Sequence, residues 1–179
     1  HILRDEITRE ALQPLIRDAL DFPVPLVPVT ERVSVLELFH GPTMAFKDVG
    51  ARVQARLLHH FTDGTPLTIL VATSGDTGSA VAQAFHRVPD SRVVVLYPEG
   101  QVSDVQEAQM ASLGDNITAL AVRGTFDDCQ RLVKQAFADT ANRVVLAVDG
   151  SKLDQRSLAA GLPWEAVTTL VTDLEPANP

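Results

Sequence analysis

Cysteine and long hydrophobic runs are nearly missing from this 179-residue sequence. Its one cysteine, Cys129, cannot form a disulfide within the chain, and such scarcity is typical of reducing compartments. The longest apolar runs, such as residues 93–97 and 144–148, have five residues, whereas a membrane-spanning helix needs about 20. No charged segment followed by an apolar one opens the sequence as a secretory leader would. We therefore expect a cytoplasmic protein without a membrane helix.

Basic residues are also few. Fifteen Lys and Arg against 23 Asp and Glu give a formal net charge of −8, so the chain has no surplus of positive charge to neutralise a phosphate backbone. This balance argues against nucleic acid as a partner. Lysine is especially rare, with only Lys47, Lys134 and Lys152 beside twelve arginines. Any reaction that uses a lysine amine therefore has three candidates.

Two kinds of catalytic signature are absent. The sequence contains no G-x-S-x-G segment, so nothing indicates a serine nucleophile of the hydrolase type. The five histidines include the neighbours His59 and His60, which face different directions on a predicted helix, and none has the spacing of metal ligands. We expect no metal site. His40 stands apart because it shares a glycine-bounded turn with Lys47, although a role in stabilising that turn is equally open.

Apolar residues make up 45% of the chain, enough for the core of one domain or slightly more. From residue 67 onward, short apolar segments alternate with segments of helical periodicity. The alternation predicts strands at 67–73, 92–97, 117–122 and 143–148, separated by helices at 79–87, 103–113 and 126–138. We therefore expect an α/β fold in which helices flank a parallel sheet. Cys129 lies on the apolar stripe of the last helix, which indicates core packing.

The first 65 residues follow a different pattern. Residues 5–20 predict a helix that Pro14 breaks or kinks, residues 21–28 predict an extended connector with three prolines, and residues 33–38 predict a strand. An apolar residue then recurs at every fourth position of a predicted helix: Val49, Val53, Leu57 and Phe61. We accordingly divide the chain into an N-terminal segment 1–65, a central α/β part 66–150 and a loosely patterned tail 151–179.

Lys47 lies where the turn His40-Gly41-Pro42-Thr43 leads into that helix. The unpaired N–H groups and the positive end of the helix disfavour its ammonium form, and desolvation would favour the neutral amine further. A neutral amine could condense with an aldehyde. A solvated lysine that pairs with Asp48 in the first turn is the simpler alternative, and the spacing alone leaves both open.

The segment Ser74-Gly75-Asp76-Thr77-Gly78 follows a predicted strand and precedes a predicted helix. At such a position, consecutive backbone N–H groups can converge on an anion. Gly75 and Gly78 permit a sharp turn and a close approach, while Ser74 and Thr77 add hydroxyl donors. The segment lacks the lysine of a Walker loop and the spacing of a dinucleotide fingerprint. It therefore indicates either an anion-binding loop or an ordinary strand-to-helix turn.

Two segments together point to a known family. Residues 37–50, ELFHGPTMAFKDVG, and residues 72–80, ATSGDTGSA, closely resemble the threonine synthases, which are pyridoxal-phosphate enzymes with the tryptophan-synthase-β-like fold, also called fold type II. The similarity extends from about residue 5 to residue 148 and includes Gln106-Glu107. Two motifs in the right order and at the right distance make this resemblance far more specific than either motif alone.

The resemblance implies pyridoxal 5′-phosphate as the cofactor, bound as an internal aldimine to the catalytic residue Lys47, with Phe46 and Asp48 shaping its setting. It implies that residues 74–78 hold the α-carboxylate of the substrate and that Asp76 lies near the 3-oxygen of the cofactor. His40 and Thr43 fall on the substrate side. The implied reaction converts O-phospho-L-homoserine and water into L-threonine and phosphate, while Lys47 moves protons among the substrate carbons.

The sequence also departs from this family. Its members are considerably longer, and their later glycine-rich loop, which holds the cofactor phosphate, has no counterpart here. Residues 149–156 match an asparagine- and serine-rich family segment poorly. We therefore expect either an incomplete piece of the enzyme or a degenerate homologue. Three alternatives stay open: a related phospho-lyase that uses the same lysine, a non-catalytic α/β binding module, and a nucleotide-binding domain that uses residues 74–78.

Overall fold

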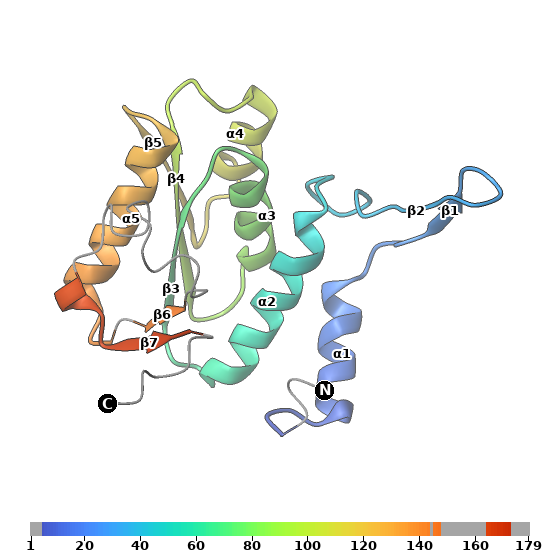
Figure 1. Ribbon diagram of the computed structural model, residues 1–179, viewed down its shortest axis with the longest axis horizontal. Helices are drawn as coiled ribbons and strands as arrows, with labels where there is room; N and C mark the ends of the chain where they lie inside the picture. Colours follow the sequence, from blue (N-terminus) through green and yellow to red (C-terminus); the bar gives the residue numbers. More distant parts are fainter. Residues whose placement is uncertain (1–4, 144, 148–163, 173–179) are drawn as a thin grey trace.

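The computed structural model describes residues 5–143, 145–147 and 164–172. A three-stranded parallel sheet forms its centre, with the strands in the order β3 (Leu67–Ala72), β4 (Ser91–Pro98) and β5 (Ile117–Val122). Helix α5 (Phe126–Thr140) lies on one side of this sheet, and α3 (Asp76–Phe85) and α4 (Asp104–Ala111) lie on the other (Figure 1). The predicted α/β fold, with helices flanking a parallel sheet, is confirmed.

The carboxyl ends of the three strands share one edge of the sheet. Ala72 at the end of β3 pairs with Leu96, and Pro98 at the end of β4 pairs with Val122 at the end of β5. Helices α3, α4 and α5 begin beyond this edge, and α2 (Lys47–Thr62) begins on the same side of the molecule (Figure 1). In open α/β sheets, ligands bind outside the carboxyl ends of the strands. The motif residues on α2 and α3 therefore lie where a ligand site is expected.

Small side chains allow α2 to pack closely on α3. Ala51 and Ala55 of α2 are buried in one core cluster with Ala80 and Ala84 of α3. The same cluster contains larger buried residues from α3, the sheet and α4: Phe85, Val93, Val95, Tyr97, Met110 and Ile117. Because alanine methyl groups occupy little space, the two helix axes can approach each other. This contact keeps the first turn of α2 next to the first turn of α3.

Helix α1 (Arg9–Ala19) begins after Thr8, whose hydroxyl accepts a hydrogen bond of 3.2 Å from the backbone N–H of Ala11. This side chain satisfies one of the N–H groups that a helix start leaves unpaired. Pro14 lies inside the helix on its exposed side, and the helix continues through it. The predicted helix is present without the break that Pro14 suggested, but it begins at Arg9 rather than at residue 5, because Thr8 is its cap.

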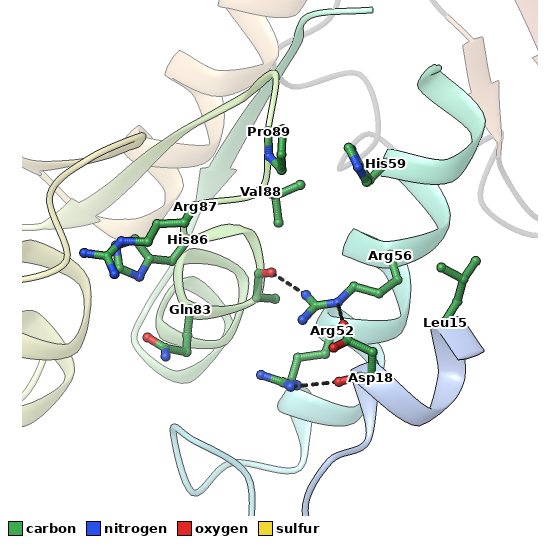
Figure 2. Close-up of a pocket in the computed structure, with 11 residues that line it drawn as sticks. Leu15, Asp18, Arg52, Arg56, His59, Gln83, His86, Arg87, Val88 and Pro89 are labelled. Atoms are coloured by element: carbon green, nitrogen blue, oxygen red, sulfur yellow. Dashed lines mark hydrogen bonds and ion pairs between the residues drawn. The ribbon is translucent and has the colours of Figure 1, made fainter. Parts of the chain in front are cut away.

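Two arginines of α2 hold α1 in place (Figure 2). Arg52 donates a hydrogen bond of 2.6 Å from Nε to the carbonyl oxygen of Ala19. Arg56 pairs with Asp18 at 2.6 Å and donates to the carbonyl oxygen of Ala84 at 3.0 Å. Both guanidinium groups border a cavity of about 430 Å³ that α1, α2 and the end of α3 enclose. Because the hydrogen-bond donors of both arginines are used within the chain, we interpret this region as the packing contact of α1 and not as a ligand site.

A short hairpin precedes α2. Strands β1 (Leu26–Pro28) and β2 (Ser34–Leu36) pair in antiparallel fashion and project away from the central sheet (Figure 1). The sequence predicted an extended connector at 21–28 and a strand at 33–38, but it did not predict that they pair. Each strand has three residues and all are exposed, so no alternation of burial marked the hairpin.

The structure corrects two boundaries of the central part. Helix α3 begins at Asp76 rather than at residue 79, because Gly75 already occupies the cap position before the first turn. Strand β6 (Val145–Ala147) pairs in parallel with β7 (Thr169–Val171), and within the described ranges it does not join the sheet of β3, β4 and β5. The predicted strand 143–148 is thus present in part, but the alternation did not reveal its partner.

Three further expectations from the sequence concern the tail, membrane helices and Cys129. Lys152 and the mismatched segment 149–156 lie outside the described residues, as does most of the tail 151–179. In the part of the chain that the structure covers, no helix is both long and apolar enough to cross a membrane. Cys129 is fully buried on α5, which confirms its predicted place in the core.

Candidate active site

Lys47 follows a turn that is built around a buried carboxylate. Asp48 is fully buried, and its two oxygens accept hydrogen bonds from the backbone N–H of Thr43 at 2.9 Å and from the Thr43 hydroxyl at 2.6 Å. Gly41 packs against the same group, since a Cβ at Gly41 would lie 2.5 Å from Asp48 Oδ2. Residues 41–46 therefore wrap around Asp48, and this arrangement fixes the point at which the Lys47 side chain leaves the backbone.

The amine of Lys47 lies beside an aromatic ring. Lys47 is half-buried as the first residue of α2, and its Nζ is 4.5 Å from the centre of the Phe46 ring. A cation at this distance is attracted by the ring face. The Asp48 carboxylate bonds Thr43 instead of Lys47, and no ion pair among the described residues joins Lys47 to Asp48. The simpler alternative from the sequence, a first-turn pair with Asp48, does not form.

A cavity of about 460 Å³ lies between the first turns of α2 and α3. Phe46 and Lys47 line one wall, and Thr77 and Ala80 line the opposite wall. Leu38, from the segment that leads into the turn, adds a further apolar surface. This volume and a mostly apolar wall with few polar groups are typical of small-molecule sites. The structure thus brings Lys47 and Thr77 to one cavity, although they are thirty residues apart in the sequence.

Thr73 organises the loop between β3 and α3. Its side chain is 2% exposed, and its hydroxyl accepts hydrogen bonds from the N–H groups of Gly75 at 3.0 Å and Gly78 at 2.9 Å. The same hydroxyl donates to the Gly75 carbonyl oxygen at 3.0 Å. Sequence reasoning missed this residue. Its only signal was that threonine hydroxyls often bond backbone groups a few residues away.

The bonds to Thr73 decide which loop groups can contact a ligand. The amides of Gly75 and Gly78 are used within the chain, so they do not face an incoming anion. Asp76 and Thr77 are the first two residues of α3, where N–H groups have no partner inside the helix. No hydrogen bond between described residues uses these two amides. Together with the exposed hydroxyls of Ser74 and Thr77, they are the donors that the loop can offer.

The structure explains why both of these loop positions are glycine. Gly75 has a φ of +144°, a region that residues with a side chain rarely adopt. Gly78 is buried against Thr73 and Met110, and a Cβ at Gly78 would collide with Thr73 Cγ2. The loop can therefore form only with glycine or with a displaced neighbour at these two positions.

Asp76 is directed toward α4 instead of the Lys47 cavity. Its Oδ1 accepts a hydrogen bond of 2.7 Å from Nε2 of Gln106, and the described walls of the cavity include Thr77 but not Asp76. Helix α4 is itself tied to the sheet, because the Tyr97 hydroxyl donates to Glu107 at 3.0 Å. Burial raises the pKa of Tyr97, and the Glu107 carboxylate that accepts its hydrogen bond raises it further.

The other two predicted site residues lie differently. Thr43 is 8% exposed and gives its hydroxyl to Asp48, so in this structure it supports the turn. His40 is exposed and its Nε2 lies 2.6 Å from Oε2 of Glu37, outside the walls of the Lys47 cavity. Their substrate roles stay predictions. Across the described ranges, no group of three or more His, Cys, Asp or Glu side chains could hold a metal ion.

Comparison with known proteins extends this description. The family model of the pyridoxal-phosphate dependent enzymes matches residues 25–162. The threonine synthase of Escherichia coli (strain K12) is 50% identical over 147 residues, which are 82% of this chain and 34% of the relative. The threonine synthase of Serratia marcescens is 52% identical over an alignment of 185 positions, which covers 97% of this chain and 43% of the relative.

A solved structure gives the same result. The crystal structure of threonine synthase from Brucella melitensis with bound pyridoxal phosphate superimposes with a TM-score of 0.71 and 42% identity, over 76% of this chain and 31% of that structure. This chain spans about a third of the length of such relatives. Both the family model and the shared fold lead to one conclusion. The chain belongs to the family of pyridoxal-phosphate-dependent enzymes.

Proposed function

We propose that the protein containing this chain converts O-phospho-L-homoserine and water into L-threonine and phosphate, as a threonine synthase. The observation that carries the proposal is the cavity shared by Lys47 at the start of α2 and Thr77 at the start of α3. The identity of 50% to a threonine synthase over 82% of the chain supports this reaction among those of the family.

The residues around the cavity fit the ring and the aldehyde of pyridoxal phosphate. Lys47 offers a half-buried primary amine, which is the group that binds an aldehyde covalently. Leu38, Ala80 and Val81 offer apolar contact for an aromatic ring. When bound, this cofactor supplies an electron sink for negative charge on the substrate carbons. We propose no residue of this chain for its phosphate, because the glycine-rich loop that holds the phosphate in the family has no counterpart in this sequence.

Each candidate residue has a distinct task in this proposal. Lys47 Nζ holds the cofactor and then accepts and returns protons at neighbouring substrate carbons, as a general acid and base. The hydroxyls of Ser74 and Thr77 and the amides of Asp76 and Thr77 bind the substrate carboxylate. Gly75 and Gly78 contribute by letting the loop adopt the shape that presents these donors. Phe46 flanks the Lys47 amine, which is 4.5 Å from its ring centre, and shapes the cofactor site.

The remaining assignments concern residues that do not line the Lys47 cavity. Asp76 is proposed to border the cofactor, which the family resemblance and its place next to Thr77 of the cavity support, while its carboxylate bonds Gln106 in this structure. His40 and Thr43 are proposed on the substrate side, because Thr43 belongs to the turn that positions Lys47 and His40 directly precedes that turn. We propose a small-molecule substrate and a cytoplasmic setting, and the scarcity of cysteine supports the setting. We also propose the division of the chain into an N-terminal segment 1–65, a central α/β part 66–150 and a tail 151–179.

Matched lysine variants test the function. In the full-length protein, Lys47→Ala is expected to lower the turnover of O-phospho-L-homoserine by a factor of at least about 10² to 10⁴, the usual contribution of a general acid–base group. Lys134→Ala is the control, because Lys134 is a half-buried residue of α5 on the other side of the sheet. Phosphate release would be measured for both. Equal turnover of the two variants, or none in the unaltered protein, contradicts the proposal.

A further inference from the structure

Gln106 links α4 to the first turn of α3 through two ends of one side chain. Its Oε1 accepts hydrogen bonds from the backbone N–H of Ser103 at 3.0 Å and from the Ser103 hydroxyl at 3.1 Å. These bonds belong to the capping box that begins α4. Its Nε2 donates a hydrogen bond of 2.7 Å to Oδ1 of Asp76. The helix cap therefore uses the oxygen of the amide, and Asp76 uses the nitrogen.

Gly75 makes room for this arrangement. A Cβ at Gly75 would collide with the amide group of Gln106, since the nearest atoms to that position are Nε2, Cδ and Oε1 of Gln106. The backbone of Gln106 is also close, because the Ser79 hydroxyl donates to its carbonyl oxygen at 3.4 Å. The Gln106 amide thus lies directly against the loop that is proposed to hold the substrate carboxylate.

The first turn of α3 is open where Asp76 could close it. A carboxylate at a helix start is attracted to the N–H groups there and readily bonds them. Asp76 is the first residue of α3, and no side chain caps this helix. Its carboxylate nevertheless bonds Gln106, and among the described residues nothing bonds the amides of Asp76 and Thr77. The contact with Gln106 therefore keeps an internal anion away from these donors.

We propose that Gln106 is a positioning residue, which holds the Asp76 carboxylate against α4 and thereby leaves the amides of Asp76 and Thr77 to the carboxylate of the substrate. The inference rests on the proposed function of the loop and adds a residue that does not touch the substrate. Without the Nε2 donor, the Asp76 carboxylate competes with the substrate for the same amides. The affinity of the loop for the substrate carboxylate then falls, although the helices keep their places.

Four variants of the full-length protein separate this role from helix capping. Gln106→Ala removes both functions of the side chain. Gln106→Glu retains an N3 acceptor for the capping box, but it replaces the donor to Asp76 with a repelling carboxylate. Ser103→Ala weakens the cap and leaves the contact between Gln106 and Asp76 in place. The double variant Gln106→Ala with Asp76→Ala removes the competing carboxylate.

The kinetic readout is KM for O-phospho-L-homoserine beside kcat. We expect KM to rise about tenfold in Gln106→Ala and further in Gln106→Glu, and to change less than about twofold in Ser103→Ala. Such a factor of ten corresponds to about 1.4 kcal/mol. The double variant also lacks Asp76, which is proposed to border the cofactor, so it enters only the binding readout below. A higher KM in Gln106→Glu than in Gln106→Ala is a result that loss of the helix cap cannot give, because Glu retains the cap acceptor. An unchanged KM in Gln106→Glu, or no effect of acetate on the double variant in the readout below, overturns the inference.

A second readout does not depend on turnover. Sodium acetate is the probe for a simple carboxylate, and the rise in melting temperature is compared with sodium chloride at equal ionic strength. We expect acetate to raise the melting temperature of the unaltered protein, of Ser103→Ala and of the double variant, but not of Gln106→Ala. If acetate has no effect on the unaltered protein, the loop is not open to a carboxylate and the inference fails. If acetate acts as expected but no L-threonine forms, the proposed reaction fails and the role of Gln106 stands.

Discussion

Thr43 encloses the buried carboxylate of Asp48 with two hydrogen bonds, of 2.9 Å from its backbone N–H and 2.6 Å from its hydroxyl. The pair closes the turn that ends at Lys47, the first residue of α2. A buried carboxylate is costly without such donors. The position of the candidate catalytic amine therefore depends on a contact that involves neither the substrate nor the cofactor.

Replacement of Asp48 tests this dependence. Asp48→Ala leaves the N–H and hydroxyl of Thr43 without their acceptor, and a buried unsatisfied donor costs about 1–3 kcal/mol. We expect the free energy of unfolding to fall by at least that amount in urea denaturation. Asp63→Asn, at the exposed opposite end of α2, is the control and should change it by less than about 0.5 kcal/mol. Equal stability of the two variants would show that the turn does not need the Asp48 carboxylate.

Thr73→Val tests the loop at the start of α3. Valine has a similar shape, but it removes the hydroxyl that accepts from the amides of Gly75 and Gly78. We expect a loss of about 1–3 kcal/mol in the free energy of unfolding, because the buried N–H of Gly75 loses its acceptor, while that of Gly78 keeps only its bond of 3.1 Å to the Gly75 carbonyl oxygen. Thr68→Val, at an exposed position of β3, should stay within about 0.5 kcal/mol. Denaturant titration measures the free energy of unfolding of both variants. A loss in Thr73→Val no larger than in Thr68→Val would contradict the hydrogen bonds described.

Acid should weaken the start of α5 through Asp128. Hydrogen bonds from the backbone N–H of Thr125, from Arg131 and from the Thr125 hydroxyl lower the pKa of Asp128 to about 2. A carboxyl whose pKa is lower in the folded protein contributes stability above its unfolded pKa of 3.8 and loses it as the pH falls toward about 2. We therefore expect the stability difference between the unaltered protein and Asp128→Asn to shrink between about pH 4 and pH 2.

The neighbouring residue provides the comparison for this pH effect. Asp127→Asn changes the same turn of α5 but leaves the bonds between Thr125 and Asp128 intact. Stability would be measured by urea denaturation at a series of pH values for both variants. A difference for Asp128→Asn that is constant across that range would refute the acid dependence.

Cys129 should resist thiol reagents while the protein is folded. The side chain is fully buried, burial raises the pKa of its thiol, and the Asp128 carboxylate raises it further. Because the thiolate is the reactive form, both effects slow alkylation. We expect iodoacetamide to modify Cys129 only at the rate of unfolding, and rapidly in 6 M guanidinium chloride. Mass spectrometry of the intact protein follows the reaction, and fast labelling without denaturant would place the thiol outside the core.

Much of the central fold is visible in the sequence because its signals are local. Each strand of the parallel sheet is a short apolar run, and each intervening helix has its own periodicity, so β3, β4 and β5 were predicted to within about one residue of their observed ends. The hairpin was not predicted as a pair, since β1 and β2 have three exposed residues each and little to distinguish them from coil. Strand β7 lies in a segment with loose periodicity.

The site shows the same division between local and distant signals. Lys47 and residues 74–78 stand out because a rare lysine and a glycine-rich turn lie at helix starts. The roles of Thr73 and Gln106 depend on three-dimensional contacts, and Gln106 meets Asp76 across thirty residues of sequence. Nothing in the local pattern distinguishes this glutamine from others on exposed helices. Topology, rather than spacing, brings its amide to the loop.

The most direct test of the central claim is covalent trapping of pyridoxal phosphate with borohydride, followed by peptide mass mapping. A modified Lys47 resists trypsin, so the account predicts a peptide of residues 33–52 that carries the reduced cofactor, because Arg32 and Arg52 flank it as the neighbouring cleavage sites. Lys47→Ala should abolish the label, and Lys134→Ala should keep it. Labelling at Lys134 or Lys152 instead, or no label at any lysine of the full-length protein, would contradict the assignment of Lys47.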